Sequence, residues 1–254
     1  MIVARMTLNP PQPGFPRSEA AYAFCASLFV VTLVLTNVIG TKLFVVPEWL
    51  PFFSGETLTS GILTYPITFL LTDLVSEIWG RQRANAMVIW GFLMSLLMLG
   101  VLSLAVSLEP SEVWTQPDHG FHSAVMLQLA FAATFANPAI LLGASMVAYL
   151  VAQLFDVRLY HFWWKVTRGR HMWLRNNGST IISQLVDTII VNGIFLRWGL
   201  DMQWDAIGRI ILMVYLFKVC LAVIDTPMIY AARAAMERFL GIAHDPGRAS
   251  APLA

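Results

Sequence analysis

Long apolar segments alternate with short polar ones along most of this chain. The first apolar segment runs from Ala20 to Gly40. As a helix its 21 residues would extend about 32 Å, which is enough to cross the hydrocarbon core of a bilayer. A second segment, Leu58 to Trp79, contains Tyr65-Pro66, which predicts a kink or break. A third, Ala86 to Leu108, carries no charge at all.

The second half of the chain continues this pattern. An uncharged run of 33 residues from Ser123 to Phe155 is too long for one crossing. Asn137-Pro138 predicts its division into a short outer helix and a fourth span, Pro138 to Phe155. The fifth and sixth spans are Ser179 to Leu196 and Ile210 to Ala232. The pattern therefore predicts an all-α, polytopic integral membrane protein with six transmembrane helices.

The two ends of the chain have a different character. Residues 1–19 contain four prolines and no signal-peptide pattern, so we expect a disordered tail. The membrane domain is expected over residues 20–236, followed by a second tail over 237–254. Both tails are expected in the cytoplasm, because the predicted loops on the side of the termini hold twelve Lys and Arg residues and the opposite side holds three.

Composition supports a membrane protein over a soluble one. Hydrophobic residues make up 57% of the chain and charged residues only 12%, whereas a soluble domain is about a quarter charged. The net charge of +1 gives no indication of a nucleic-acid partner. The basic and aromatic residues mixed over 158–178 are typical of a membrane interface.

The stretch Trp173 to Trp198 holds the most informative polar residues. The segment Arg175 to Ser179 contains Asn-Gly-Ser, which predicts a turn with positive φ at Gly178 and an N-cap at Ser179. The following apolar helix contains one carboxylate, Asp187, with Ser183 and Gln184 on its helix face. A charge this deep in a membrane span is costly and normally faces the protein interior.

Other polar residues lie inside the predicted spans, and each also has a structural interpretation. Glu77 can reach water or Arg81, and Lys218 with Asp225 can pair with other spans. Amides such as Asn37 and Gln184 can simply bridge helices. Gln-Leu-x-Asp occurs at 153–156 and at 184–187, but four residues are too few to establish a repeat. The candidate substrate-binding residues are Asn37, Asp73, Glu77, Gln184, Asp187, Lys218 and Asp225.

No pattern in the sequence predicts a cofactor, a metal site or a catalytic centre. His119 and His122 have metal-like spacing but no third ligand nearby. Ser-His-Asp, phosphate-loop and metalloprotease patterns are absent from the sequence.

Four segments together resemble the queuosine precursor transporters, which belong to the vitamin uptake transporter group. They are TNVIGTKLF (36–44), YPITFLLTDLVSEIWGR (65–81), GRHMWLRNNGSTIISQLVDT (169–188) and Lys218 with Asp225-Thr226-Pro227. The resemblance extends from Ala20 to Ala235. It implies six spans and import of 7-deazaguanine precursors of queuosine across the inner membrane, by a transporter and not an enzyme.

Two alternatives stay open at this point, as does a homodimer. Asp73 and Asp187 could form the carboxylate pair of an intramembrane aspartyl-type enzyme. The chain could also be the substrate-binding subunit of a multi-component uptake transporter. For a carrier, the expected partners are a small heteroaromatic solute and the lipid bilayer. A carboxylate could accept the two adjacent donors of a deazaguanine, and an amide or Lys could donate to its carbonyl.

Overall fold

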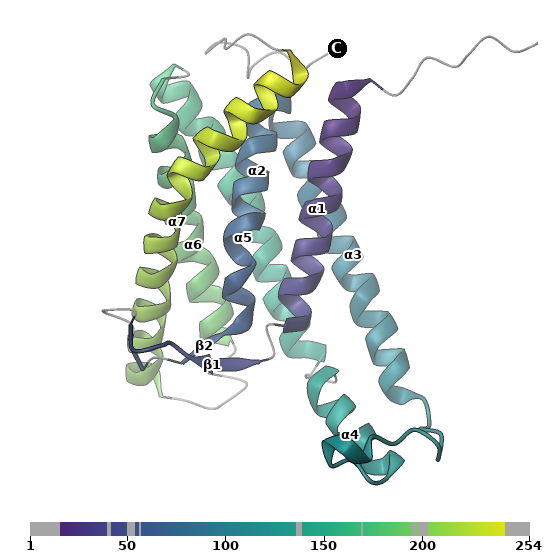
Figure 1. The fold of residues 1–254 in the computed structure, drawn as a ribbon. Coiled ribbons are helices and arrows are strands. Elements are labelled where there is room, and N and C mark those ends of the chain that lie inside the picture. Colours follow the sequence, from purple (N-terminus) through teal and green to yellow (C-terminus); the bar gives the residue numbers. More distant parts are fainter. Residues whose placement is uncertain are drawn as a thin grey trace, which may run out of the picture.

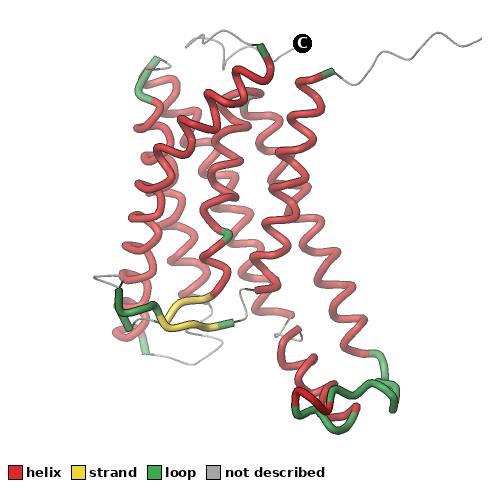
Figure 2. The backbone as a smooth tube through the Cα atoms, viewed as in Figure 1, coloured by secondary structure: helices red, strands yellow, loops and turns green. Residues whose placement is uncertain are grey.

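The computed structural model describes residues 16–39, 42–49, 54–55, 57–135, 139–168, 170–194, 197 and 203–241. Helices dominate the described chain (Figure 2). They are α1 (Arg17–Ile39), α2 (Tyr65–Trp79), α3 (Arg81–Ser107), α4 (Ala124–Phe135), α5 (Ala139–Thr167), α6 (Met172–Ile194) and α7 (Trp204–Leu240), with short 3-10 helices at Ser60–Leu63 and Pro117–His119. Strands β1 (Leu43–Val45) and β2 (Thr57–Thr59) pair antiparallel, with Leu43 opposite Thr59.

The long helices run side by side as a bundle (Figure 1). The β1–β2 pair and α4 lie at one end of it, and the start of α1 and the end of α7 lie at the other. Within the described residues, three helical segments are long and apolar enough to cross a membrane, namely Arg17–Ile39, Arg81–Ser107 and Ile207–Leu240. The prediction of an all-α membrane protein is confirmed in these terms, with one small two-stranded sheet outside the bundle.

The break predicted at Tyr65-Pro66 is present. Helix α2 begins at Tyr65, and Pro66 occupies its first turn, where a missing backbone N–H costs nothing. The chain before it forms β2 and a short 3-10 helix instead of the first part of a span. Gly80 then joins α2 to α3 with φ of 84°, a left-handed conformation that other residues rarely adopt.

The turn predicted at Arg175 to Ser179 is wrong. Helix α6 already begins at Met172 and continues through this segment, and Gly178 is not among the glycines with positive φ. The Ser179 hydroxyl donates to the Asn176 carbonyl within the helix (3.1 Å) and does not cap it. Gly178 has a packing role, because a Cβ atom there would lie 2.9 Å from Nε1 of Trp163 on α5.

Two other helices are longer than the sequence predicted. Helix α5 continues past Phe155 to Thr167, and α7 runs from Trp204 to Leu240 with Pro227 inside it. Figure 1 shows the last part of α7 leaning across α2, which places α7 side chains over the end of α2. Part of each predicted tail, residues 1–15 and 242–254, lies outside the described residues.

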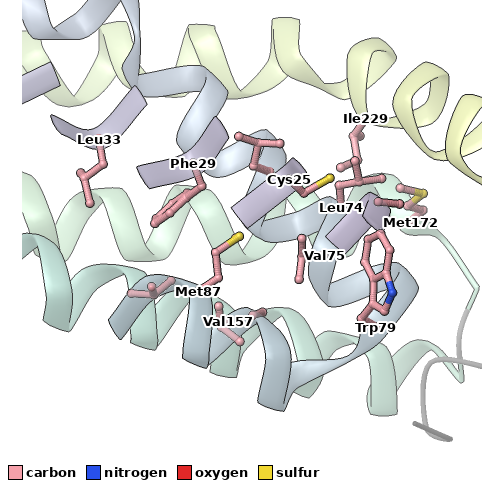
Figure 3. Close-up of a cluster of buried hydrophobic side chains, with 14 residues drawn as sticks. Cys25, Phe29, Leu33, Leu74, Val75, Trp79, Met87, Val157, Met172 and Ile229 are labelled. Atoms are coloured by element: carbon pink, nitrogen blue, oxygen red, sulfur yellow. The ribbon is translucent and has the colours of Figure 1, made fainter. Parts of the chain in front are cut away.

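An apolar core joins α1, α2 and α3 and reaches α5, α6 and α7. Phe29, Val75 and Met87 are essentially buried and lie in one cluster with Val157 and Ile229 (Figure 3). Helices α1 and α3 approach closely at Gly91, where a Cβ atom would lie 2.6 Å from the Phe29 ring. This packing fixes α2 against α1 and α3 on one side, so its opposite side faces α5 and α7.

Candidate functional site

Buried polar residues recur along α6 at helical spacing. Asn176, Thr180, Ser183 and Asp187 follow one another at intervals of three or four, so they share one side of the helix. Ser183 contacts α5 and Asp187 contacts α7. Since α6 packs along both of these helices, its polar side is enclosed by protein and not by lipid. Two separate groups of polar side chains lie in the interior between these helices, and each includes a residue of α2.

The first group, which we call the Glu77 network, consists of Glu77, Tyr160, Arg175 and Arg233. The Arg175 Nη2 atom lies 2.9 Å from both carboxylate oxygens of Glu77. The Tyr160 hydroxyl donates to the same carboxylate at 2.6 Å, and Arg233 donates to it as well. Glu77 is therefore bound by side chains from α5, α6 and α7 at once.

This network is deeply buried and electrically balanced. The Arg175 side chain has no exposed surface, and its guanidinium also lies 4.0 Å from the centre of the Trp164 ring. The second arginine, Arg233, also pairs with Glu237 at 2.8 Å. Two arginines therefore face two glutamates, as a buried charge requires. The expectation that Glu77 reaches water or Arg81 is wrong, because its side chain is buried and pairs with Arg175 and Arg233.

The second group, which we call the Asp73 cluster, consists of Asp73, Asp156, Ser183 and Gln184. Asp73 lies one turn before Glu77 on α2 and is only 1% exposed. Within the described residues, no N–H or O–H group donates to either of its carboxylate oxygens. Asp156, on the neighbouring helix α5, is likewise buried. Asp156 also accepts a hydrogen bond from Ser183 of α6 at 2.8 Å.

Further buried polar atoms in and around this cluster have no hydrogen-bond partner among the described residues. Gln184, which follows Ser183 on α6, is 2% exposed, and within the described residues neither its amide nitrogen nor its amide oxygen has a hydrogen-bond partner. The same holds for the hydroxyls of Ser76 and Thr180. Buried polar atoms are normally hydrogen-bonded in a native protein, so several exceptions in one region indicate a place for a polar ligand or water.

Asp187 and Lys218 form an ion pair between α6 and α7. The Lys218 ammonium lies 2.6 Å from the Asp187 carboxylate, with side-chain exposures of 12% and 4%. The sequence placed both residues among the candidates without predicting the pair. Their contact joins α6 to α7. The expectation that Asp187 also contacts a ligand stays a prediction.

The remaining candidates lie apart from these contacts or at their edge. Asn37 on α1 donates to the Ser95 hydroxyl of α3 at 3.3 Å, on the other side of the bundle from α6. Asp225 on α7 is half-buried. The described residues contain no group of three or more His, Cys, Asp or Glu side chains that could hold a metal ion.

Sequence reasoning missed three residues that matter here. Asp156 was assigned to the end of a span, and Arg175 and Arg233 were counted as cytoplasmic charges. A signal for Asp156 was present in the repeated Gln-Leu-x-Asp. In the structure both copies place their Gln and Asp in the buried interior, as Gln153, Asp156, Gln184 and Asp187. No comparable signal distinguished the two arginines from interfacial ones.

Comparison with known proteins identifies the family. The family model described as "Putative vitamin uptake transporter" matches residues 59–232, which is more than half of the chain. This chain belongs to that family. Its members are transporters and not enzymes, so the aspartyl-type enzyme is excluded as an alternative. The matched region includes every residue of the Asp73 cluster and all of the Glu77 network except Arg233.

Curated relatives carry more specific names. A "Probable queuosine precursor transporter" of Bacillus subtilis is 32% identical over 70% of this chain and 73% of its own length. The "Queuosine precursor transporter" of Escherichia coli is 28% identical over 67% of this chain and 70% of its own length. A Haemophilus influenzae protein named like the first is 26% identical over 65% and 64%. No solved structure matches the chain.

Proposed function

We propose that this protein imports 7-deazaguanine-type precursors of queuosine across the inner membrane. The relatives named above support this cargo. The resemblance of residues 36–44, 65–81 and 169–188 to the queuosine precursor transporters supports it as well. The observation that carries the proposal is the Asp73 cluster. Its residues are buried on α2, α5 and α6, and the Asp73 carboxylate and the Gln184 amide have no hydrogen-bond partner among the described residues.

The chemistry of the cluster suits such a cargo. The guanine-like edge of a 7-deazaguanine presents two adjacent donors, a ring N–H and an exocyclic amine, next to a carbonyl acceptor. A carboxylate of the Asp73–Asp156 pair can accept from both donors, and the Gln184 amide can donate to the carbonyl. A purine analogue that lacks the exocyclic amine would leave a buried acceptor unpaired, so the site would reject it.

The surrounding ion pairs have a different role in this proposal. The Glu77 network and the Asp187–Lys218 pair hold α6 and α7 around the site and are not primary contacts of the solute. Among the sequence-based candidates, Asp73 and Gln184 are therefore the proposed solute contacts, and Asp156 is added to them.

Six spans with both termini in the cytoplasm complete the proposal. Helices α1, α2, α3, α5, α6 and α7 would be the spans, and the start of α1 and the end of α7 lie at the same end of the bundle (Figure 1). Two of the twelve basic residues counted as cytoplasmic, Arg175 and Arg233, are in the buried network. The excess of Lys and Arg on the predicted cytoplasmic side remains when these two residues are left out.

Transport by purified protein in liposomes is the direct test. We expect uptake of radiolabelled 7-deazaguanine without any added subunit, and exchange of labelled for unlabelled solute across the membrane. Binding without uptake would instead support the substrate-binding subunit of a larger transporter. A thermal-shift panel of purines and deazapurines would rank the ligands, since a ligand that binds only the folded state raises the melting temperature.

Cysteine labelling tests the orientation. We expect a cysteine at Gln116 to react with an impermeant reagent from outside the cell, and one at Arg170 to react only after the membrane is opened. Both positions are exposed, so reagent access and not burial decides the result. The reverse pattern would contradict the proposed topology.

A further inference from the structure

The part of helix α7 that follows Pro227, residues 228–240, differs from the rest of that helix. A proline inside a helix has no N–H to donate to the preceding turn, so the helix bends more easily there. Figure 1 shows that the last part of α7 leans across α2. We call residues 228–240 the α7 terminal segment. The Thr226 hydroxyl, just before the proline, accepts a hydrogen bond from Asn177 of α6 at 2.7 Å, which anchors the bend.

The α7 terminal segment covers the parts of α2 and α6 that lie next to the Asp73 cluster. Its Arg233 donates to Glu77, which lies one turn after Asp73 on α2. The same guanidinium lies 3.5 Å from the sulfur of Met172, the first residue of α6, and Met172 is only 5% exposed. Because Glu77 is buried under this segment, a solute that leaves the Asp73 cluster toward this end of the bundle has to displace it.

The charges of the Glu77 network divide into two pairs. Arg175 of α6 lies 2.9 Å from both carboxylate oxygens of Glu77, and its guanidinium also packs on the Trp164 ring. Arg233 has a carboxylate on its own segment, because Glu237 lies 2.8 Å from it one turn later. If the segment moves away, Glu77 keeps Arg175 and Arg233 keeps Glu237. No buried charge then loses its last counter-ion, so the contact between Arg233 and Glu77 is separable.

The remaining contacts of the segment can also be given up. The Tyr230 hydroxyl accepts from the backbone N–H of Trp173 at 3.1 Å, and both side chains are exposed. This N–H is in the first turn of α6, where it has no partner within the helix and water can replace the tyrosine. Ile229 is fully buried, but it lies directly beside the bend and moves least. The other apolar contacts come from partly buried side chains, namely Ala232, Met236 and Leu240.

We propose that the α7 terminal segment is a gate through which the solute leaves for the cytoplasm, with its hinge at Pro227 and Arg233 as its latch on Glu77. This inference rests on the proposed function, which supplies the solute and places this end of the bundle in the cytoplasm. The structure shows the closed state, in which Arg233 joins the segment to α2. In the open state Arg233 stays with Glu237, and water reaches Glu77 and the Asp73 cluster behind it.

Cysteine labelling measures the opening of this gate. The reporter is Met172→Cys in the detergent-purified full-length protein, because the Met172 sulfur lies next to Arg233. Arg233→Gln removes the charge of the latch, so the rate of reaction with a charged maleimide should rise about tenfold. The matched control is Arg238→Gln, an exposed arginine of the same segment, which should leave the rate unchanged. The wild-type protein is the blank for the native Cys25 and Cys220.

A second reporter separates gate opening from general loosening of the fold. Met146→Cys is suitable because Met146 is 3% exposed and lies in the first half of α5, far along that helix from Tyr160. It should stay unreactive when Arg233→Gln is added. An unchanged rate at Met172→Cys would overturn the latch, and an equal rise at both reporters would show loss of packing throughout the bundle and overturn the gate.

Closing the gate chemically tests its role in transport. Proteoliposomes contain the double variant Met172→Cys/Arg233→Cys, and exchange of radiolabelled 7-deazaguanine across the membrane is measured. A short bifunctional methanethiosulfonate links the two positions, whose side chains meet in this structure, and a reductant cuts the link. Linking should reduce exchange to background, and the reductant should restore it. The same treatment should not change exchange by either single variant.

The outcomes separate the gate from the transporter that contains it. Exchange that continues undiminished in the linked protein would overturn the gate and leave the proposed function intact. If the double variant does not fold, the two labelling reporters still decide whether the segment opens at the latch. Absence of exchange in the untreated wild-type protein would overturn the proposed function and the release of solute through the segment, even if labelling at Met172→Cys responded to Arg233→Gln.

Discussion

Asp73 and Glu77 lie one turn apart on α2 and are similarly buried, but their partners differ completely. Glu77 accepts hydrogen bonds from Tyr160, Arg175 and Arg233, which come from three other helices. Asp73 receives no donor from the described residues. The difference shows that a carboxylate in a span can serve two purposes, and that its partners and not its depth decide which.

The Glu77 network has the contacts expected of a structural element. Its charges are matched, and it joins α2, α5, α6 and α7 at one end of the bundle. Further hydrogen bonds link α6 and α7 nearby, from Asn177 to Thr226 at 2.7 Å and from the Trp173 backbone to the Tyr230 hydroxyl at 3.1 Å. The Asp73 cluster has unmatched groups instead, which is tolerable only if something else binds there.

The largest expected effect follows from Glu77→Gln. The change keeps the shape of the side chain but leaves Arg175 and Arg233 without their shared carboxylate. Loss of one partner from a buried ion pair costs about 3–5 kcal/mol. We expect a large fall in the melting temperature of the detergent-purified protein. The matched control is Glu19→Gln, which breaks the partly exposed pair with Arg83 and should have little effect. Equal melting temperatures for the two variants would contradict a structural role for the network.

A smaller loss of stability is expected for Asp187→Asn. The Asn side chain can still accept a hydrogen bond from Lys218, but the charge of the pair is lost. A hydrogen bond to a charged group contributes about 1.5–3 kcal/mol, so we expect a destabilisation in that range. Lys218→Met and the double variant complete a cycle that isolates the coupling between the two residues. Additive effects would show that the 2.6 Å contact contributes nothing.

Asp73→Asn should have the opposite profile from Glu77→Gln. Among the described residues no donor depends on the Asp73 carboxylate, so the fold should keep its melting temperature. If this carboxylate accepts from the solute, the affinity should fall by about 1.5–3 kcal/mol, or roughly ten- to a hundredfold. Ligand affinity and melting temperature are measured on the same sample. A fall in melting temperature without any change in affinity would place Asp73 with Glu77 as a structural residue.

The sequence alone predicted the fold class, but it did not predict that Asp73 and Glu77 have different partners. Apolar segments of membrane length and Pro66 predicted the membrane protein and the start of α2, because hydrophobic length and proline geometry act locally. The prediction of a turn at Gly178 was wrong because the glycine of Asn-Gly-Ser can serve close packing as well as a turn. Here a glycine inside a helix lets the Trp163 ring approach. Only the three-dimensional packing of α5 on α6 decides between the two uses.

The site was predicted in part for the same reason. An isolated carboxylate in an apolar span is visible in a sequence, and Asp73, Glu77 and Asp187 were all found in this way. Partners on other helices are not visible. Asp156 was hidden because α5 continues for a further eleven residues to Thr167, which moves Asp156 from a predicted helix end into the interior. The role of Arg175 was missed because basic residues beside aromatic ones are typical of a membrane interface.

The smallest expected effect sharpens the comparison within the Asp73 cluster itself. Ser183 distinguishes Asp156 from Asp73, because its hydroxyl donates to Asp156 at 2.8 Å, besides the Thr180 carbonyl at 3.1 Å, and not to Asp73. Ser183→Ala removes this donor without adding a charge or leaving a large cavity. The expected loss of stability is about 1 kcal/mol. Without the hydroxyl the Asp156 carboxylate loses a donor that orients it, so it is less well placed to accept from a solute. We therefore expect a modest loss of 7-deazaguanine affinity. The matched control is Ser107→Ala on α3, where the exposed hydroxyl donates only to the Leu104 carbonyl. Binding titrations at several pH values should show parallel curves for the control and the wild-type protein, and a shifted curve for Ser183→Ala. A Ser183→Ala curve that superimposes on the control would show that the serine does not set the difference between the two carboxyls.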